Sequence, residues 1–107
     1  MKVRYLIALT AALTVSASAF AADDGEAVFK KSTCVSCHSV DKKSVGPAFK
    51  DVAAKYAGDK GAQAKLEAKV RAGGSGSFGA MPMPPTAKSV SDENIKSIVT
   101  WVLSLKK

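Results

Sequence analysis

The sequence predicts an all-α fold, and three observations indicate it. Apolar residues recur with the spacing of amphipathic helices in residues 49–56 and again in residues 91–105. No run of alternating apolar or β-branched residues is long enough to form a useful strand. Glycine- and proline-rich segments separate the helical patterns, as connecting loops do. We therefore expect four to five short helices in a single domain.

The first helix is predicted for residues 26–31, where a glutamate opens the segment and Lys30 and Lys31 close it. This order of charges suits the helix dipole. Val28 and Phe29 would face the core. The helix leads directly towards residues 34–38, so its end would position that segment.

The second helix is predicted to begin at Phe49, with Gly58 as its stop. Its apolar face would consist of residues at positions i, i+3, i+4 and i+7, namely Phe49, Val52, Ala53 and Tyr56.

A third helix is predicted for residues 62–72, and the two glycines that follow would end it. Leu66 and Val70 would point inward. Glu67 and Arg71, four positions apart, would form an ion pair on the surface.

The last helix should begin near Ser91, whose hydroxyl can cap it, with two acidic residues in its first turn. We expect it to pack across the first helix, with Trp101 in the core. Its apolar stripe would consist of Ile95, Ile98, Val99, Val102 and Leu103.

The start of the chain has the pattern of a cleaved secretory signal peptide. Residues 1–4 are basic, residues 5–15 are mostly apolar, and Ala19-Phe20-Ala21 fits a small-residue cleavage site. The apolar run is short for a membrane anchor. Cleavage after Ala21 or Ala22 would leave residues 23–107 as the mature domain. Residues 1–22 contain two basic and no acidic residues, so the formal charge would fall from +7 to +5.

Residues 34–38 have the sequence CVSCH, a spacing typical of c-type haem attachment. On a helical turn, Cys34 and Cys37 share a face and could bond the two vinyl groups of one porphyrin, while His38 reaches the iron. A thioredoxin-like redox pair would need a sheet-containing fold, and structural zinc needs four ligands. The chain has only two cysteines and one histidine. A plain disulfide would leave His38 unexplained.

The mature domain is too short to bury much apolar surface by itself. A central haem would supply the missing core, so we expect the haem-free chain to be largely unfolded. Pro47, in the turn VGPA at residues 45–48, has two compatible interpretations. Its carbonyl could accept the ring N–H of the metal-bound histidine, or the residue could serve to start the next helix.

A second axial ligand, if there is one, cannot be a histidine, because His38 is the single histidine in the sequence. Met81 and Met83 lie in a stretch of glycines and prolines, residues 75–85, that is stiffer than an ordinary linker. One of them could bind iron while the other fills space. The spacing does not separate the two, and a lysine or an open position also remains possible.

Five segments together resemble the class I cytochromes c, and most closely the small bacterial cytochrome c-551 family. The resemblance covers nearly all of residues 23–107 and implies a compact helical fold around one covalently bound haem c. It assigns Cys34 and Cys37 as thioether links, His38 as proximal ligand and Met83 as distal ligand. It also places the Pro47 carbonyl on the His38 ring N–H. The segments are CVSCH at 34–38, VGPA at 45–48, KDVAAKYAG at 50–58, MPP at 83–85 and WVLS at 101–104.

Two positions near the haem depart from the family pattern. Phe78 stands where a tryptophan commonly donates a hydrogen bond to a propionate, and Lys69 stands where an arginine is often found. Because Phe78 cannot donate, propionate anchoring should differ from that in the family. Residues 87–90 also form a slightly longer segment than the usual pattern.

Two axial ligands from the protein would leave the iron no open position, and His/Met ligation raises its potential. We therefore predict an electron-transfer protein and not an enzyme. The resemblance implies a monomeric periplasmic carrier in respiration or denitrification, with a membrane cytochrome complex as donor. A nitrite reductase, oxidase or peroxidase would be the acceptor. Two alternatives stay open: a five-coordinate haem protein that binds small ligands, and the electron-entry subunit of a larger enzyme.

The excess of positive charge could steer the encounter with acidic redox partners, or it could form an ordinary solvated surface. Aromatic residues do not interleave with the basic ones, so nucleic-acid binding is not expected. The lysines nearest the haem segments in sequence are Lys30, Lys31, Lys42, Lys43, Lys50 and Lys55.

Overall fold

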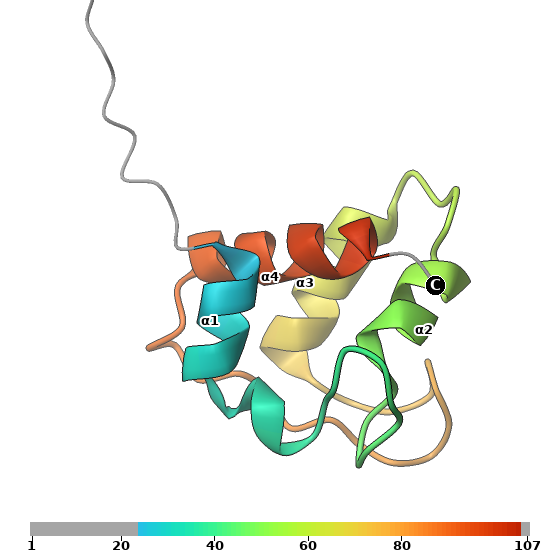
Figure 1. Cartoon of the computed structure of the whole chain (residues 1–107). Coiled ribbons are helices and arrows are strands. Elements are labelled where there is room, and N and C mark those ends of the chain that lie inside the picture. The colour runs from blue at the N-terminus through green and yellow to red at the C-terminus, as the bar shows by residue number, and fades with distance from the viewer. Residues whose placement is uncertain (1–23, 106–107) are drawn as a thin grey trace, which may run out of the picture.

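The computed structural model describes residues 24–105, so the signal peptide predicted for residues 1–22 lies outside the described part of the chain. The described part is helical, which confirms the all-α prediction (Figure 1). Its single β-type pairing is an isolated bridge between Gly74 and Met83. The elements are α1 (Gly25–Lys31), the 3₁₀ helix η1 (Thr33–Ser36), α2 (Phe49–Lys55), α3 (Ala62–Ala72) and α4 (Asp92–Ser104).

The C-terminal helix α4 organises the fold, because it packs against α1, α2 and α3 (Figure 1). It begins directly after Ser91, whose hydroxyl accepts a hydrogen bond from the backbone N–H of Asn94 at 3.1 Å. This is the predicted N-cap. The buried residues of the helix belong to the predicted stripe: Ile95, Ile98, Val99 and Val102.

Helix α1 crosses α4 at Gly25. A Cβ atom built on Gly25 would lie 2.2 Å from the Ser97 carbonyl oxygen and 2.5 Å from the Trp101 Cβ, so only glycine allows this approach. One turn later, the Phe29 ring centroid lies 5.0 Å from that of Phe49 and 5.4 Å from that of Trp101. The predicted packing of the last helix across the first is confirmed. This crossing fixes where α1 ends and therefore where η1 begins.

Arg71 does not form the ion pair predicted from sequence. We expected a partner four residues earlier on α3, at Glu67, but the guanidinium Nη2 lies 2.6 Å from the Asp92 carboxylate at the start of α4. The prediction was wrong because it used only the spacing along one helix, whereas the end of α3 lies close to the start of α4.

Candidate haem-binding cavity

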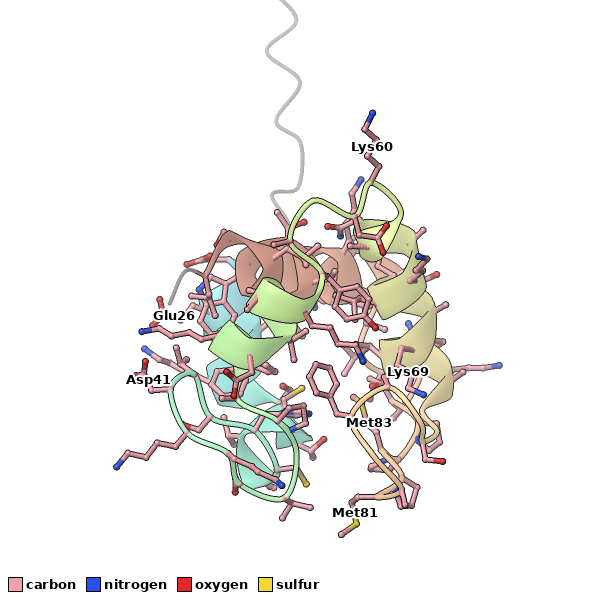
Figure 2. All side chains as sticks on the ribbon, turned by 90° about the vertical axis from the view of Figure 1, so that its right-hand side faces the viewer. Glu26, Asp41, Lys60, Lys69, Met81 and Met83 are labelled. Atoms are coloured by element: carbon pink, nitrogen blue, oxygen red, sulfur yellow. The ribbon has the colours of Figure 1, made fainter. Side chains whose placement is uncertain are left out.

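A cavity of about 730 Å³ lies between the helices and two loops. One loop, residues 43–47, follows the CVSCH segment, and the other, residues 74–84, carries both methionines (Figure 2). The volume falls within the range of about 300–1,000 Å³ that is usual for cofactor pockets. The interior is apolar, as a porphyrin requires. Its aliphatic lining comes from Val52 of α2, Leu66 and Val70 of α3, and Ile98, Val99 and Val102 of α4.

Both cysteines face this cavity from a tight helical turn. Cys34 lies in η1, and its carbonyl oxygen accepts the N–H groups of Cys37 at 3.1 Å and His38 at 2.9 Å. Residues three apart are eclipsed in a 3₁₀ turn, so the two side chains project from one face. Both are free thiols that line the cavity. The turn thus presents two nucleophilic sulfurs to one occupant.

The His38 ring is held by three neighbours. Its Nδ1 lies 2.8 Å from the Pro47 carbonyl oxygen, and its face stacks on Phe49 with a centroid distance of 4.9 Å and an interplanar angle of 22°. A Cβ atom on Gly46 would lie 2.5 Å from the ring Cε1. A carbonyl oxygen can only accept, so Nδ1 is the donor in this contact, and the neutral tautomer that makes it has its lone pair on Nε2. The chain therefore prepares Nε2 as a metal ligand.

Met83 is positioned through its backbone. Its N–H donates to the Gly74 carbonyl oxygen at 2.9 Å, and its carbonyl oxygen accepts the Gly74 N–H at 2.8 Å. Gly73, the residue before Gly74, has φ +69°, and a Cβ atom there would lie 2.4 Å from the Met83 carbonyl oxygen. Any side chain at Gly73 would thus push the methionine segment away from α3.

The two methionines differ in exposure, although both line the cavity. Met83 is half-buried, whereas Met81 is 67% exposed. Figure 2 shows Met81 at the outer end of its loop and Met83 closer to α3. Sequence spacing alone did not separate the two residues, but their burial favours Met83 as the one that faces an occupant.

Two lysines hold the glycine-rich loop at the cavity rim. The Lys69 ammonium donates to the Ser75 carbonyl oxygen at 3.1 Å, and that of Lys55 donates to the Ser77 carbonyl oxygen. Lys55 Nζ also lies 4.4 Å from the centroid of the Phe78 ring, a cation–π contact. Lys69 and Phe78 both line the cavity, where the resemblance places them.

Sequence reasoning did not identify Gly46 as a site residue. The VGPA turn was recognised, but only the structure shows that Gly46 lies against the histidine ring. A glycine next to a proline that was already a candidate partner of His38 is the signal that could have indicated it.

The helical fold, the paired thiols and the histidine with a prepared Nε2 together define a c-type cytochrome. Sequence comparison leads to the same class, because residues 22–106 match the family described as Cytochrome c. The chain belongs to the cytochrome c family. It is a small monohaem electron carrier with one covalently bound haem c, not an enzyme.

Several relatives match over most of the chain. Cytochrome c-551 of Pseudomonas aeruginosa is 47% identical over 106 residues, covering 99% of this chain and 100% of that protein. Cytochrome c-551 of Allochromatium vinosum is 53% identical over 94 residues, covering 88% and 96%. The crystal structure of Nitrosomonas europaea cytochrome c552 matches with a TM-score of 0.72 and 46% identity, over 76% of this chain and 99% of that one.

Proposed function

We propose that Cys34 and Cys37 form the thioether links to the haem, and that His38 Nε2 and the Met83 sulfur are the axial ligands. The observation that carries this assignment is the contact between His38 Nδ1 and the Pro47 carbonyl oxygen, 2.8 Å long. In the neutral ring, this contact places the proton on Nδ1 and leaves the Nε2 lone pair available to a metal. Met83 contributes to the same cavity from the opposite loop. When bound, the haem supplies a one-electron couple between ferrous and ferric iron.

The protein residues around this couple favour electron transfer over ligand binding. Two side chains would occupy both axial positions, so no small molecule could bind without displacing one. The proximal ring is fixed by stacking on Phe49 and by contact with Gly46. A fixed ring needs little rearrangement when the charge on the iron changes. We therefore favour a free carrier over the five-coordinate alternative.

The proposed contact surface for redox partners is the rim of the cavity. Within residues 24–105, the large apolar residues that are exposed are Val35, between the two cysteines, and three rim residues, Val45, Phe78 and Met81. Exposed apolar side chains at the rim suit transient protein contacts. The cysteines that would attach the haem line the same cavity, so a partner that docks at the rim would come close to the haem edge.

Positive charge around the rim would steer acidic partners. Lys43 and Lys69 line the cavity, whereas Lys50 and Lys30 form surface ion pairs with Asp41 and Glu26 and contribute less net charge. The rate of electron transfer to an acidic partner should therefore fall as salt is added. Stopped-flow measurement at several ionic strengths tests this, and a rate that does not change with salt would remove the steering role.

The proposed setting is the periplasm, with residues 1–22 acting as a cleaved export signal. There the monomeric protein would carry electrons from a membrane cytochrome complex to a nitrite reductase, oxidase or peroxidase in respiration or denitrification. The signal pattern supports export, and membership of the cytochrome c family supports the carrier role. Among the described residues, no helix is long and apolar enough to cross a membrane.

Absorption spectroscopy of the purified protein tests the ligand assignment. The ferric protein should show the weak methionine-to-iron charge-transfer band at the red end of the visible range. The ferrous protein should not react with carbon monoxide. If the band is missing and carbon monoxide binds rapidly, the iron has an open position and the ligand-binding function replaces the carrier.

A further inference from the structure

The Arg71 side chain connects the end of α3 to the segment that follows Met83. Nη1 donates to the carbonyl oxygens of Ala87 at 3.1 Å and Thr86 at 3.4 Å. Nη2 donates to the Val90 carbonyl oxygen at 2.8 Å and to the Asp92 carboxylate at 2.6 Å. The side chain of Arg71 is only 31% exposed, whereas that of Asp92 is 90% exposed. The Arg71 side chain is thus partly buried against residues 86–90, whose carbonyl oxygens it binds.

Residues 83–90 are held to α3 at successive points. The first is the backbone bridge between Met83 and Gly74. The second is the Thr86 N–H, which donates to the Val70 and Arg71 carbonyl oxygens at 3.2 and 3.3 Å. The third is the Arg71 guanidinium. All three of these hydrogen-bonded points lie at the C-terminal end of α3 or in the glycines that follow it.

The short connection between Met83 and the Arg71 contacts is stiff. Pro84 and Pro85 lie between Met83 and Thr86, and proline fixes φ. A displacement at Thr86 would therefore be passed back to Met83 and not absorbed in a flexible linker.

We propose that Arg71 is a positioning residue for the distal ligand, and that its four hydrogen bonds set how firmly Met83 holds the iron. The inference rests on the proposed role of Met83. The planar guanidinium fork suits this task, because it donates in fixed directions to several acceptors at once. A lysine at this position could bind only part of the same set.

Binding of imidazole to the ferric protein measures the strength of the distal bond, because imidazole must displace the methionine. We would compare the wild-type protein with Arg71→Met, Arg71→Lys and Asp92→Asn, following the titration by absorption. Arg71→Met should raise the apparent imidazole affinity about tenfold or more, since hydrogen bonds from a charged group are lost. Arg71→Lys and Asp92→Asn should raise it less, by about threefold.

Two controls separate positioning from other effects. Lys65→Met removes a cation from the same helix, but Lys65 pairs with Asp59, away from the distal loop. It should leave imidazole affinity within about twofold of wild type. Arg71→Met and Asp92→Asn change the net charge in opposite directions. A purely electrostatic effect would move the affinity in opposite directions, whereas loss of positioning raises it in both.

Heating then distinguishes positioning from general stability. In Arg71→Met the charge-transfer band should disappear at a lower temperature than the helical circular dichroism signal. If both signals are lost together, or if imidazole affinity equals that of wild type, the inference is overturned. If Arg71→Met yields no holoprotein, the same criteria apply to Arg71→Lys and Asp92→Asn. A wild-type protein without the band would instead overturn the ligand assignment of Met83.

Discussion

The two sides of the cavity restrain their candidate ligands in different ways. On the proximal side, the restraints act on the His38 ring itself, through a hydrogen bond, a stacked ring and a glycine contact. On the distal side, the hydrogen bonds of Met83 are made by its backbone at the Gly74 bridge. The proximal ligand is thus oriented by the chain before any metal binds. The distal ligand is placed by its loop, and its thioether is the less restrained of the two.

The largest effect on the structure should follow from removing the haem, because the proximal and distal sides of the cavity would both lose their contacts with it. Without haem, the apolar residues that line the cavity of about 730 Å³ would lose the packing contacts that the haem would supply. A domain of this size has only about 5–15 kcal/mol of stability. The Cys34→Ala/Cys37→Ala variant, extracted to remove haem, should therefore lose most of its far-ultraviolet circular dichroism. Helical content equal to that of the holoprotein would show that the two sides assemble without haem.

The next largest effect concerns the distal side. Met83→Ala should abolish the charge-transfer band and lower the reduction potential by on the order of 0.1 V, because axial ligands set haem potentials over a range of about 0.8 V. Met81→Ala is the matched control, since Met81 is 67% exposed and should leave the potential near that of wild type. Potentiometric titration measures both. If only the Met81 variant changed, the distal ligand would be Met81.

On the proximal side, Gly46→Ala should displace the His38 ring, because the new Cβ would lie 2.5 Å from the ring Cε1. We expect a loss of about 1–3 kcal/mol in stability, as for an overpacked core, together with a shifted absorption spectrum. Gly61→Ala is the control, because its Cβ would meet the Asp59 Oδ1 at 3.4 Å, an ordinary contact. Denaturant unfolding and the ferric spectrum test the pair. Equal behaviour of the two variants would mean that the ring is not confined as described.

The sequence predicted the parts of the fold that depend on local patterns. The helix of residues 62–72 was predicted with the bounds that the structure gives it, because apolar spacing and a following glycine define it. The Ser91 cap also followed from residue type. The need for glycine at position 25 could not be predicted in this way, because the residue that it contacts, Ser97, is far away in the chain. Only the packing of α1 on α4 shows why that position must be glycine.

The same limit applies to the site. The CVSCH spacing and the turn at Pro47 indicated the proximal residues, because those contacts are close in sequence. The distal side depends on tertiary structure: spacing left Met81 and Met83 equivalent, and it assigned Arg71 to a neighbour on its own helix. Burial distinguishes the methionines, and the approach of α4 to α3 explains the partner of Arg71.

The smallest effect should come from the ion pair at the start of α3, which lies apart from both sides. Hydrogen bonds from Lys65 Nζ and the Gly61 N–H lower the pKa of Asp59, and the hydrogen bond to Asp59 raises the pKa of Lys65. A lowered carboxyl pKa gives stability that is present above the unfolded-state pKa and lost as pH falls through the folded-state value. The raised lysine pKa gives stability that is lost only as pH rises through its own folded-state value in the alkaline range.

Asp59→Asn should therefore lower the thermal midpoint slightly at neutral pH, by less than about 3 °C, because exposed ion pairs contribute little. The difference from wild type should vanish in strong acid, where Asp59 is protonated. The asparagine oxygen can still accept the Gly61 N–H, so the turn should persist. Thermal unfolding measured across pH tests this, with the charge-transfer band recorded alongside. An altered band would mean that the N-terminal end of α3 also positions Met83, and that the distal side does not depend on its C-terminal end alone.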